Sequence, residues 1–361
     1  MPRTLASLIT SFILCFLITP LVIKFLGKKN IMDKPGGRKI HAGDTPSMGG
    51  VSIFFAVIIA AAIFMPFLYI QKFKFFFGAM GVMFLVGLRD DLVPVRPLVK
   101  LSAQLLAATM IIFLMEIRLT AFYDLFAIEN IPYLLSVVLT LFTFIVITNS
   151  YNLIDGLDGL ASSVGIIAFF FFGIYFFLVG IVQYSIICFS FIGALIAFLN
   201  FNWQPSRIFM GDTGALLIGS VLAVITIKFI DYNHHLPVTN EFKLDASVGV
   251  GIAVIIIPLF DTLRVFISRA IKKKSPFSPD KTHIHHLLMR LGFSHAGTTL
   301  IIVGANIGIV LLAITLDSLG DNLVVPIIIG TCVILSVMLD VLVKQSIIRK
   351  KQHISKKFRR D

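Results

Sequence analysis

Apolar segments of about 20 residues recur along the whole chain, and short polar strings separate them. A helix of that length can cross a bilayer core of roughly 30 Å. The pattern therefore predicts an all-α polytopic membrane protein with about 11 transmembrane helices. They are expected at about 5–26, 48–70, 74–89, 99–115, 131–148, 160–179, 182–200, 213–230, 246–267, 298–316 and 322–343. We expect one transmembrane domain over residues 1–343 and a basic tail over residues 344–361.

The composition supports this interpretation. The chain is 57% hydrophobic and only 14% charged, whereas charged residues make up about a quarter of a soluble domain. The apolar segments leave no room for a sizeable soluble domain. Cys15, Cys188 and Cys332 lie far apart within apolar segments, so we expect small core residues and neither disulfides nor a metal site.

The distribution of Lys and Arg predicts the orientation, because these residues accumulate on the cytoplasmic side of a membrane. One set of loops, together with the C-terminal tail, holds 25 of the 31 basic residues. The other side keeps Arg3, Lys72, Lys74, Arg118, Lys228 and Lys243. We therefore expect the N-terminus outside and the C-terminus in the cytoplasm.

The net charge of +12 does not predict nucleic-acid binding, since no aromatic and basic stripe lies on a folded domain. The tail RKKQHISKKFRR is expected to fix the topology and to contact anionic lipid headgroups.

Five polar strings fall on the predicted cytoplasmic side, at about 33–50, 87–100, 149–161, 200–216 and 264–292. Acidic residues at a membrane boundary are costly without a partner, so these loops are expected to build an active site. A transporter would place its polar groups near the middle of its spans. Most predicted spans are apolar there, which favours chemistry at the cytoplasmic face. A transporter or binding protein for an anionic lipid or nucleotide is the alternative from a different class.

The string GLRDDLVP carries two adjacent carboxylates, Asp90 and Asp91, where an apolar helix leaves the membrane. They could form a solvated helix end. Together with Lys100 they also suit a divalent cation or a base that acts on a phosphate, because Mg²⁺ prefers oxygen ligands and often bridges to substrate phosphates.

The string NSYNLIDGLDG repeats Asn149, Asn152, Asp155 and Asp158 at intervals of three. A helix would direct this polar stripe to one place. A capped helix start is the alternative, and a calcium loop is excluded because the Glu that an EF-hand needs is absent.

In the string RIFMGDTGAL, Asp212 precedes an apolar segment. It could cap that helix, whose N-terminus would also favour a phosphate. Phe209 could stack on a nucleobase or could simply pack.

The string HIHH supplies His283, His285 and His286 without any cysteine. Histidines beside oxygen-rich loops fit magnesium and phosphate better than a zinc site. The amphipathic segment 262–274 is expected at the membrane interface. There Arg264 could steer a lipid phosphate, or could pair with Asp261 three residues earlier.

Taken in order, DKPGGRKIHAGDTPSMGG, DDLVPVRPLVK, NSYNLIDGLDGLA, FNWQPSRIFMGDTGALLIG, PLFDTLRV and HIHH resemble the polyprenyl-phosphate N-acetylhexosamine-1-phosphate transferases of glycosyl transferase family 4. The match runs from about residue 30 to residue 292. This family includes the bacterial undecaprenyl-phosphate GlcNAc-1-phosphate transferases and the phospho-MurNAc-pentapeptide translocase. Any single string is weak, but five in order on one membrane face are specific.

The resemblance implies a Mg²⁺-dependent enzyme of the bacterial inner (plasma) membrane, in which Mn²⁺ could substitute. A UDP-N-acetylhexosamine would give its sugar-1-phosphate to undecaprenyl phosphate and release UMP. This would be the first membrane step of a cell-surface polysaccharide such as O-antigen. A homodimer would be usual for such enzymes. We favour direct attack by the lipid phosphate over a covalent aspartyl intermediate.

The resemblance also implies residue roles. Asp212 would be the main Mg²⁺ ligand and Asn152 a second one, while Asp90 and Asp91 match the family's acidic pair. Asp158 and Phe209 would hold uracil. The groups near the diphosphate would be Lys100 and the histidines His283, His285 and His286. The remaining substrate-binding candidates are Asn149, Asp155 and Arg264.

Two features distinguish the branches of the family. The translocase branch has a Pro-Ile-His-His-His setting, whereas this chain has His283-Ile284-His285-His286. The eleventh predicted span and the basic tail also favour the GlcNAc-1-phosphate branch. The translocase reaction is the alternative, and relatives that use QuiNAc or FucNAc leave the sugar open.

Overall fold

The computed structural model describes residues 2–29, 31, 45–123, 125, 131–273 and 282–357, with side chains as far as residue 349. In chain order the α-helices are α1 (Pro2–Lys28), α2 (Gly50–Phe64), α3 (Phe67–Leu92), α4 (Pro97–Thr109), α5 (Tyr133–Ile154), α6 (Leu160–Leu178), α7 (Val182–Asn202), α8 (Gly211–His235), α9 (Ser247–Val254), α10 (Ile256–Ile271), α11 (Ile284–Leu291), α12 (His295–Thr315) and α13 (Asp321–Lys357). A π-helical turn, Met110–Leu114, extends α4, and a 3₁₀ turn, Asp317–Leu319, precedes α13.

Eight described helices are long and apolar enough to cross a membrane, or nine if α9 and α10 form one broken span. The eight are α1, α4 with its π-helical turn, α5, α6, α7, α8, α12 and α13. The helix α2 has only 15 residues. The all-helical polytopic prediction is therefore confirmed, while the number of 11 spans and the orientation stay predictions.

Two of the expected spans are broken in the structure. The span expected at 48–70 ends at Phe64, because Met65 is extended before Pro66 and α3 begins at Phe67. The span expected at 246–267 is broken at Ile255, where α9 and α10 meet at 79°. Asn306 of α12 donates from Nδ2 to the Val254 carbonyl at 3.4 Å, which serves one of the backbone groups that the break exposes.

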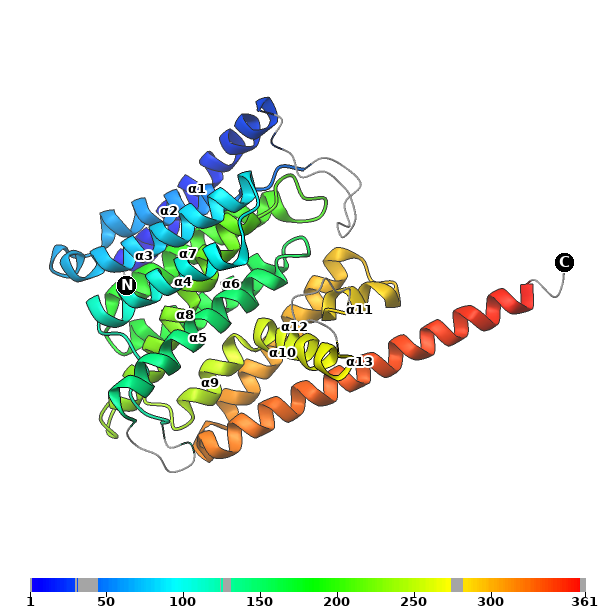
Figure 1. The fold of residues 1–361 in the computed structure, drawn as a ribbon. Helices are drawn as coiled ribbons and strands as arrows, with labels where there is room; N and C mark the ends of the chain where they lie inside the picture. Colours follow the sequence, from blue (N-terminus) through cyan, green and yellow to red (C-terminus); the bar gives the residue numbers. More distant parts are fainter. Residues whose placement is uncertain are drawn as a thin grey trace.

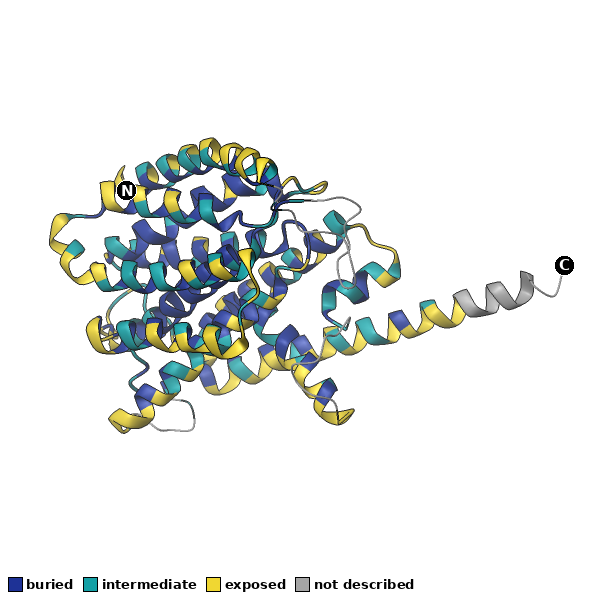
Figure 2. Ribbon diagram, turned by 45° about the horizontal axis from the view of Figure 1, so that its top comes forward, coloured by how far each residue is buried: buried dark blue, intermediate teal, exposed yellow. Residues whose placement is uncertain are grey.

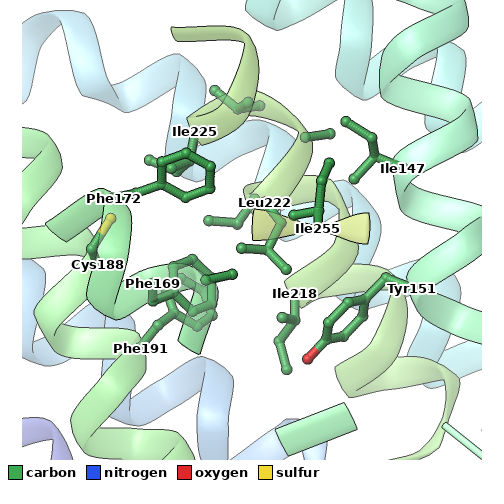
Figure 3. Packing of buried hydrophobic residues seen from close by; sticks show 14 of the residues in the cluster. Ile147, Tyr151, Phe169, Phe172, Cys188, Phe191, Ile218, Leu222, Ile225 and Ile255 are labelled. Carbon is green, nitrogen blue, oxygen red and sulfur yellow. The ribbon is translucent and has the colours of Figure 1, made fainter. Parts of the chain in front are cut away.

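The core is built around α8, which packs on α2, α3, α5, α6 and α9. Its midsection carries only apolar and small residues, so it can be buried on all sides. Figure 3 shows Ile218, Leu222 and Ile225 of α8 among aromatic rings of α6 and α7. Figure 2 shows exposed positions along the outer helices. Many of the exposed residues are large and apolar, as expected of surfaces that face lipid.

Glycines let two helices approach the start of α8. A Cβ on Gly50 would lie 2.1 Å from the backbone nitrogen of Gly214, and one on Gly87 would lie 2.5 Å from the carbonyl oxygen of Asp212. The helices α2 and α3 can therefore contact the first turn of α8 backbone to backbone. This contact brings the end of α3, with its two aspartates, beside Asp212.

Figure 1 shows the turns after α5 and α7 and the short helix α11 at one end of the bundle. The same view shows α13 as a long helix that extends beyond the other helices. Residues 344–357 continue α13 without a break, so this part of the basic tail is helical and not a separate segment.

Candidate active site

The first turn of α8 is the centre of the site. Gly211 has φ +72°, a conformation that favours glycine, and a Cβ there would lie 2.5 Å from Asp91 Oδ2. Asp91 accepts the backbone N–H of Asp212 at 2.9 Å with Oδ1 and that of Thr213 at 2.9 Å with Oδ2. The Thr213 hydroxyl also donates to Oδ2, at 2.5 Å. Asp91 of α3 therefore caps the N-terminus of α8 from a distance in sequence.

Asp90 points to a different partner. Its Oδ2 lies 2.5 Å from Lys100 Nζ, and the same ammonium lies 2.7 Å from Asp212 Oδ2. Asp90 Oδ1 accepts the backbone N–H of Val95 at 2.7 Å, which fixes the turn between α3 and α4. The side chains of Lys100 and Asp212 remain 24% and 27% exposed, so a ligand can reach them. The adjacent aspartates thus have separate roles, one toward Lys100 and one toward the helix backbone.

Two asparagines of α5 make hydrogen bonds at this site. Asn152 Nδ2 donates to Asp212 Oδ1 at 2.5 Å. One turn earlier, Asn149 exchanges two amide hydrogen bonds of 3.0 Å with Gln104 of α4. Lys100 and Gln104 lie one turn apart on α4. Asn149 therefore links α5 to α4 directly, and Asn152 links them through Asp212. The side-chain amide of Asn149 is therefore engaged by that of Gln104.

Asp155 lies in the turn after α5 and accepts the backbone N–H of Gly211. Removal from water, together with the negative charges of Asp212 and Asp91, raises the pKa of Asp155 well above its ordinary value of 3.8. We call Asp90, Asp91, Asp155 and Asp212, with Lys100, the carboxylate cluster. In it, Lys100 contacts Asp90 and Asp212, while Asp91 and Asp155 accept backbone N–H groups at the start of α8.

This donor set fits a hard divalent cation. Mg²⁺ is usually held by one or two carboxylates, waters and substrate phosphates, and not by a cage of protein ligands alone. Among the described residues, no group of three or more His, Cys, Asp or Glu forms such a cage. Asp90 and Asp212 offer carboxylate oxygens, and a cation would offset the excess of negative charge. In this structure Asn152 donates to Asp212, so a ligand role would use its carbonyl oxygen.

The expected stripe of four residues does not continue past α5. The helix ends at Ile154, and Gly159, with φ +74°, starts the next one. Asp158 therefore points away from Asp212. Its Oδ1 accepts the Ser206 hydroxyl at 3.0 Å, and its Oδ2 lies 3.3 Å from His295 Nδ1. Asp158 thus joins the turn 155–159 to the loop before α8 and to the start of α12.

Phe209 is partly exposed in the loop before α8. Its backbone N–H donates to the Pro46 carbonyl at 2.9 Å, and its carbonyl accepts the N–H of Gly49 at 2.9 Å. An isolated parallel bridge joins it to Ser47. The C-terminal end of the expected loop 33–50 therefore reaches the site, while its residues 33–44 lie outside the described part of the chain.

A second group of polar residues surrounds residues 282–286, which we call the histidine segment. Asp261 of α10 accepts the backbone N–H of Ile284 at 2.9 Å with Oδ1, and its Oδ2 lies 2.8 Å from His283 Nδ1. Asp261 thereby caps α11 and orients the ring of His283. The preceding residues 274–281 of the expected loop 264–292 lie outside the described chain.

His285 is 3% exposed, and a Cβ on Gly156 would lie 3.3 Å from its Nε2. Burial, with the neighbouring histidine His286 as the next cause, lowers the pKa of His285 to about 3. His286 is partly exposed, with its ring centroid 4.3 Å from that of His285. The histidine segment therefore contacts the turn that also carries Asp155. His286 is the one of its three histidines that is not buried.

Within the described part of the chain, Arg264 pairs with Asp340 and not with Asp261. Its guanidinium donates to Ser336 Oγ and Asp340 Oδ1, each at 2.7 Å, and to the Thr282 carbonyl at 2.6 Å. The structure places it among these partners on α13 and at the start of the histidine segment. Its expected contact with a lipid phosphate stays a prediction.

Sequence reasoning missed several residues that shape the site. Gln104, His295 and Asp340 belong to no expected motif, and Ser206 lies in the expected string 200–216 without an expected role. Their spacing along the chain carries no signal, because each one contacts a partner that is distant in sequence.

Comparison with known proteins identifies the family of this chain. A family model described as Glycosyl transferase family 4 matches residues 73–230, which include the carboxylate cluster. A probable undecaprenyl-phosphate N-acetylglucosaminyl 1-phosphate transferase of Bacillus subtilis is 31% identical over 303 residues, covering 84% of this chain and 82% of the relative. An undecaprenyl-phosphate alpha-N-acetylglucosaminyl 1-phosphate transferase of Escherichia coli is 30% identical over 301 residues, covering 80% and 78%. A decaprenyl-phosphate N-acetylglucosaminephosphotransferase of Mycolicibacterium smegmatis is 30% identical over 290 residues, covering 74% and 71%.

Proposed function

The chain belongs to glycosyl transferase family 4, the polyprenyl-phosphate N-acetylhexosamine-1-phosphate transferases, and we propose that it transfers GlcNAc-1-phosphate from UDP-GlcNAc to undecaprenyl phosphate. The products would be UMP and undecaprenyl-diphospho-GlcNAc. The observation that carries the proposal is the carboxylate cluster, which gathers acidic groups from the end of α3, the start of α8 and the turn after α5 beside Lys100.

Both substrates are phosphates, so the site has to hold two anions together. The ammonium of Lys100 lies between Asp90 and Asp212 and can turn toward the diphosphate of the donor. The remaining carboxylates would repel a phosphate unless a cation offsets them. Mg²⁺, held by Asp212 with Asp90 or Asn152, would supply that charge and stabilise the UMP leaving group.

Asp90 is the group that we assign to the lipid phosphate. A phosphate monoester has a second pKa near 6, so its deprotonation contributes little at neutral pH. Asp90 would therefore act mainly by orienting Lys100 and the attacking oxygen, since positioning and electrostatics dominate phosphoryl transfer. We favour direct attack by the lipid phosphate. Asp91 already accepts three hydrogen bonds from α8, which argues against its use as a covalent nucleophile.

Phe209 and Asp158 are the groups that we assign to the uracil. Phe209 is partly exposed beside the start of α8, where a ring could stack on a base. Both carboxylate oxygens of Asp158 have a partner, yet each oxygen has a second lone pair that could accept the uracil N–H.

We place the site at the cytoplasmic face of a bacterial plasma membrane. The bias of Lys and Arg toward this end of the bundle supports that orientation. The phospho-MurNAc-pentapeptide transferase reaction is the second candidate. The order His-Ile-His-His and the helix α13 favour the GlcNAc-1-phosphate reaction over it.

The experiment uses purified protein in detergent with Mg²⁺, undecaprenyl phosphate and UDP-GlcNAc. We expect UMP and a lipid-linked diphosphosugar in equal amounts. UDP-GalNAc and UDP-MurNAc-pentapeptide are the donor controls. Absence of UMP with every UDP-N-acetylhexosamine would refute the proposal, and turnover of UDP-MurNAc-pentapeptide alone would favour the second candidate.

A further inference from the structure

We infer that Arg264 and Asp340 form a positioning pair that fixes the histidine segment from α13. The inference rests on the proposed function in taking the histidine segment as part of the active site. It assigns a role to Asp340, in a helix that carries none of the expected motifs. For Arg264 it assigns a positioning role.

The first step concerns the hydrogen bonds between α10 and the start of α11. Asp261 holds His283 and the Ile284 N–H, and Arg264, one turn later, donates to the Thr282 carbonyl at 2.6 Å. Three consecutive residues of the histidine segment are thus held by two side chains of α10. Because one contact is to a donor and one to an acceptor of the backbone, together they fix the direction of the chain as it enters α11.

The second step is the link from Arg264 to α13. Its Nη2 donates to Asp340 Oδ1 and its Nε to Ser336 Oγ, both at 2.7 Å. Asp340 and Ser336 lie one turn apart on α13, so their oxygens face the same side of that helix. The planar guanidinium has its donors in a fixed arrangement. The three hydrogen bonds therefore fix both the position and the orientation of the Arg264 guanidinium.

The third step concerns the packing between α11 and α13. A cavity of about 180 Å³ lies beside both helices and is lined by Ile284, Leu288 and Leu339, among other apolar side chains, and by the polar Ser336. Apolar packing is therefore incomplete where the histidine segment meets α13. The polar link through Arg264 supplies the specific geometry that the packing lacks, since a hydrogen-bonded pair constrains direction and apolar contact does not.

The test has two readouts that are independent of each other. The first is the rate at which diethyl pyrocarbonate modifies His283, measured by mass spectrometry with exposed His235 as the internal reference. In Asp340→Asn we expect His283 to react several times faster than in the wild type, and Asp340→Glu to restore slow modification. This readout needs no turnover. Unchanged reactivity of His283 would overturn the inference, whatever the activity.

The second readout is UMP release. We expect kcat of Asp340→Asn to fall about tenfold with KM for the UDP-sugar within about twofold, since a small misplacement lowers the rate of the chemical step. Arg349→Gln, which removes one charge from an exposed position on the opposite side of α13 from Asp340, is the matched control and should keep the wild-type rate. Ser336→Ala is a milder second variant in case Asp340→Asn does not fold. A wild type that releases no UMP while His283 reactivity changes as expected would refute the proposed function and not this pair.

Discussion

The carboxylate cluster and the histidine segment lie at the same end of the bundle, yet they use their polar groups in different ways. In the cluster, Asp90 and Asp212 share Lys100, and their side chains stay partly open. In the histidine segment, two of the three histidines are buried and Asp261 holds His283 directly. The cluster therefore has the charge and access that phosphates and a cation need, whereas the segment depends on residues that hold it in place.

A large loss of activity is expected from Asp90→Asn. The variant removes the charge beside Lys100 and leaves the α8 cap untouched. We expect kcat for UMP release to fall about a hundredfold, the size of loss seen when one preorganised electrostatic group is removed. The thermal unfolding midpoint should stay close to that of the wild type. A kcat within twofold of the wild type would remove Asp90 from the chemistry.

Variants of the neighbouring Asp91 separate a structural role from a catalytic one. Asp91→Ala removes the acceptor of two backbone N–H groups of α8, so we expect it to destabilise the protein by about 1–2 kcal/mol. Thermal unfolding in detergent measures this, and Asp91→Asn, which keeps one acceptor oxygen, should be less destabilised. If Asp91→Ala were inactive but as stable as the wild type, Asp91 would belong to the chemistry and not to the cap.

The buried histidine predicts a pH dependence of stability. The pKa of His285 is about 3 in the folded protein and about 6.5 when unfolded. Between these values the unfolded chain binds more protons, so stability falls as the pH drops below about 6.5, by at most about 1.4 kcal/mol per pH unit. Thermal midpoints at pH 7.5 and 5.5 should differ more in the wild type than in His285→Gln. Equal differences would show that His285 is not held neutral.

The smallest effect is expected at Phe209, which we assign to the uracil. Phe209→Ala should raise KM for the UDP-sugar about fivefold, the low end for one aromatic ring stacked on a base, because Phe209 is partly exposed. The value of kcat should change little. Phe209→Tyr, which keeps the ring, is the matched control. An unchanged KM in Phe209→Ala would make this ring a packing residue only.

Much of this site was predictable from the sequence, because its acidic residues follow apolar segments that alternate in direction. That alternation brings Asp90, Asn152 and Asp212 to one end of the bundle. The separate roles of Asp90 and Asp91 were not predictable. They depend on Gly87 and Gly211, which let α3 approach α8 closely enough for one of two adjacent carboxylates to reach the helix backbone.

The expected polar stripe of four residues was wrong for a local reason. A pattern with a period of three assumes a continuous helix, but the chain leaves the helical conformation after Ile154 and turns at Gly159. Likewise, no sequence pattern could pair Arg264 with Asp340, since the two helices that carry them meet only after the break at Ile255 has set the direction of α10.

The most direct test of the carboxylate cluster is UMP release by Asp212→Asn across a Mg²⁺ titration. The substitution keeps the backbone N–H that Asp91 accepts, so the fold is expected to persist, as an unchanged thermal midpoint would verify. We predict that the wild type releases UMP only with Mg²⁺, UDP-GlcNAc and undecaprenyl phosphate together. The variant should release none above background at any Mg²⁺ concentration. Release by Asp212→Asn at the wild-type rate, with the same Mg²⁺ dependence, would contradict the assignment of the reaction to this cluster.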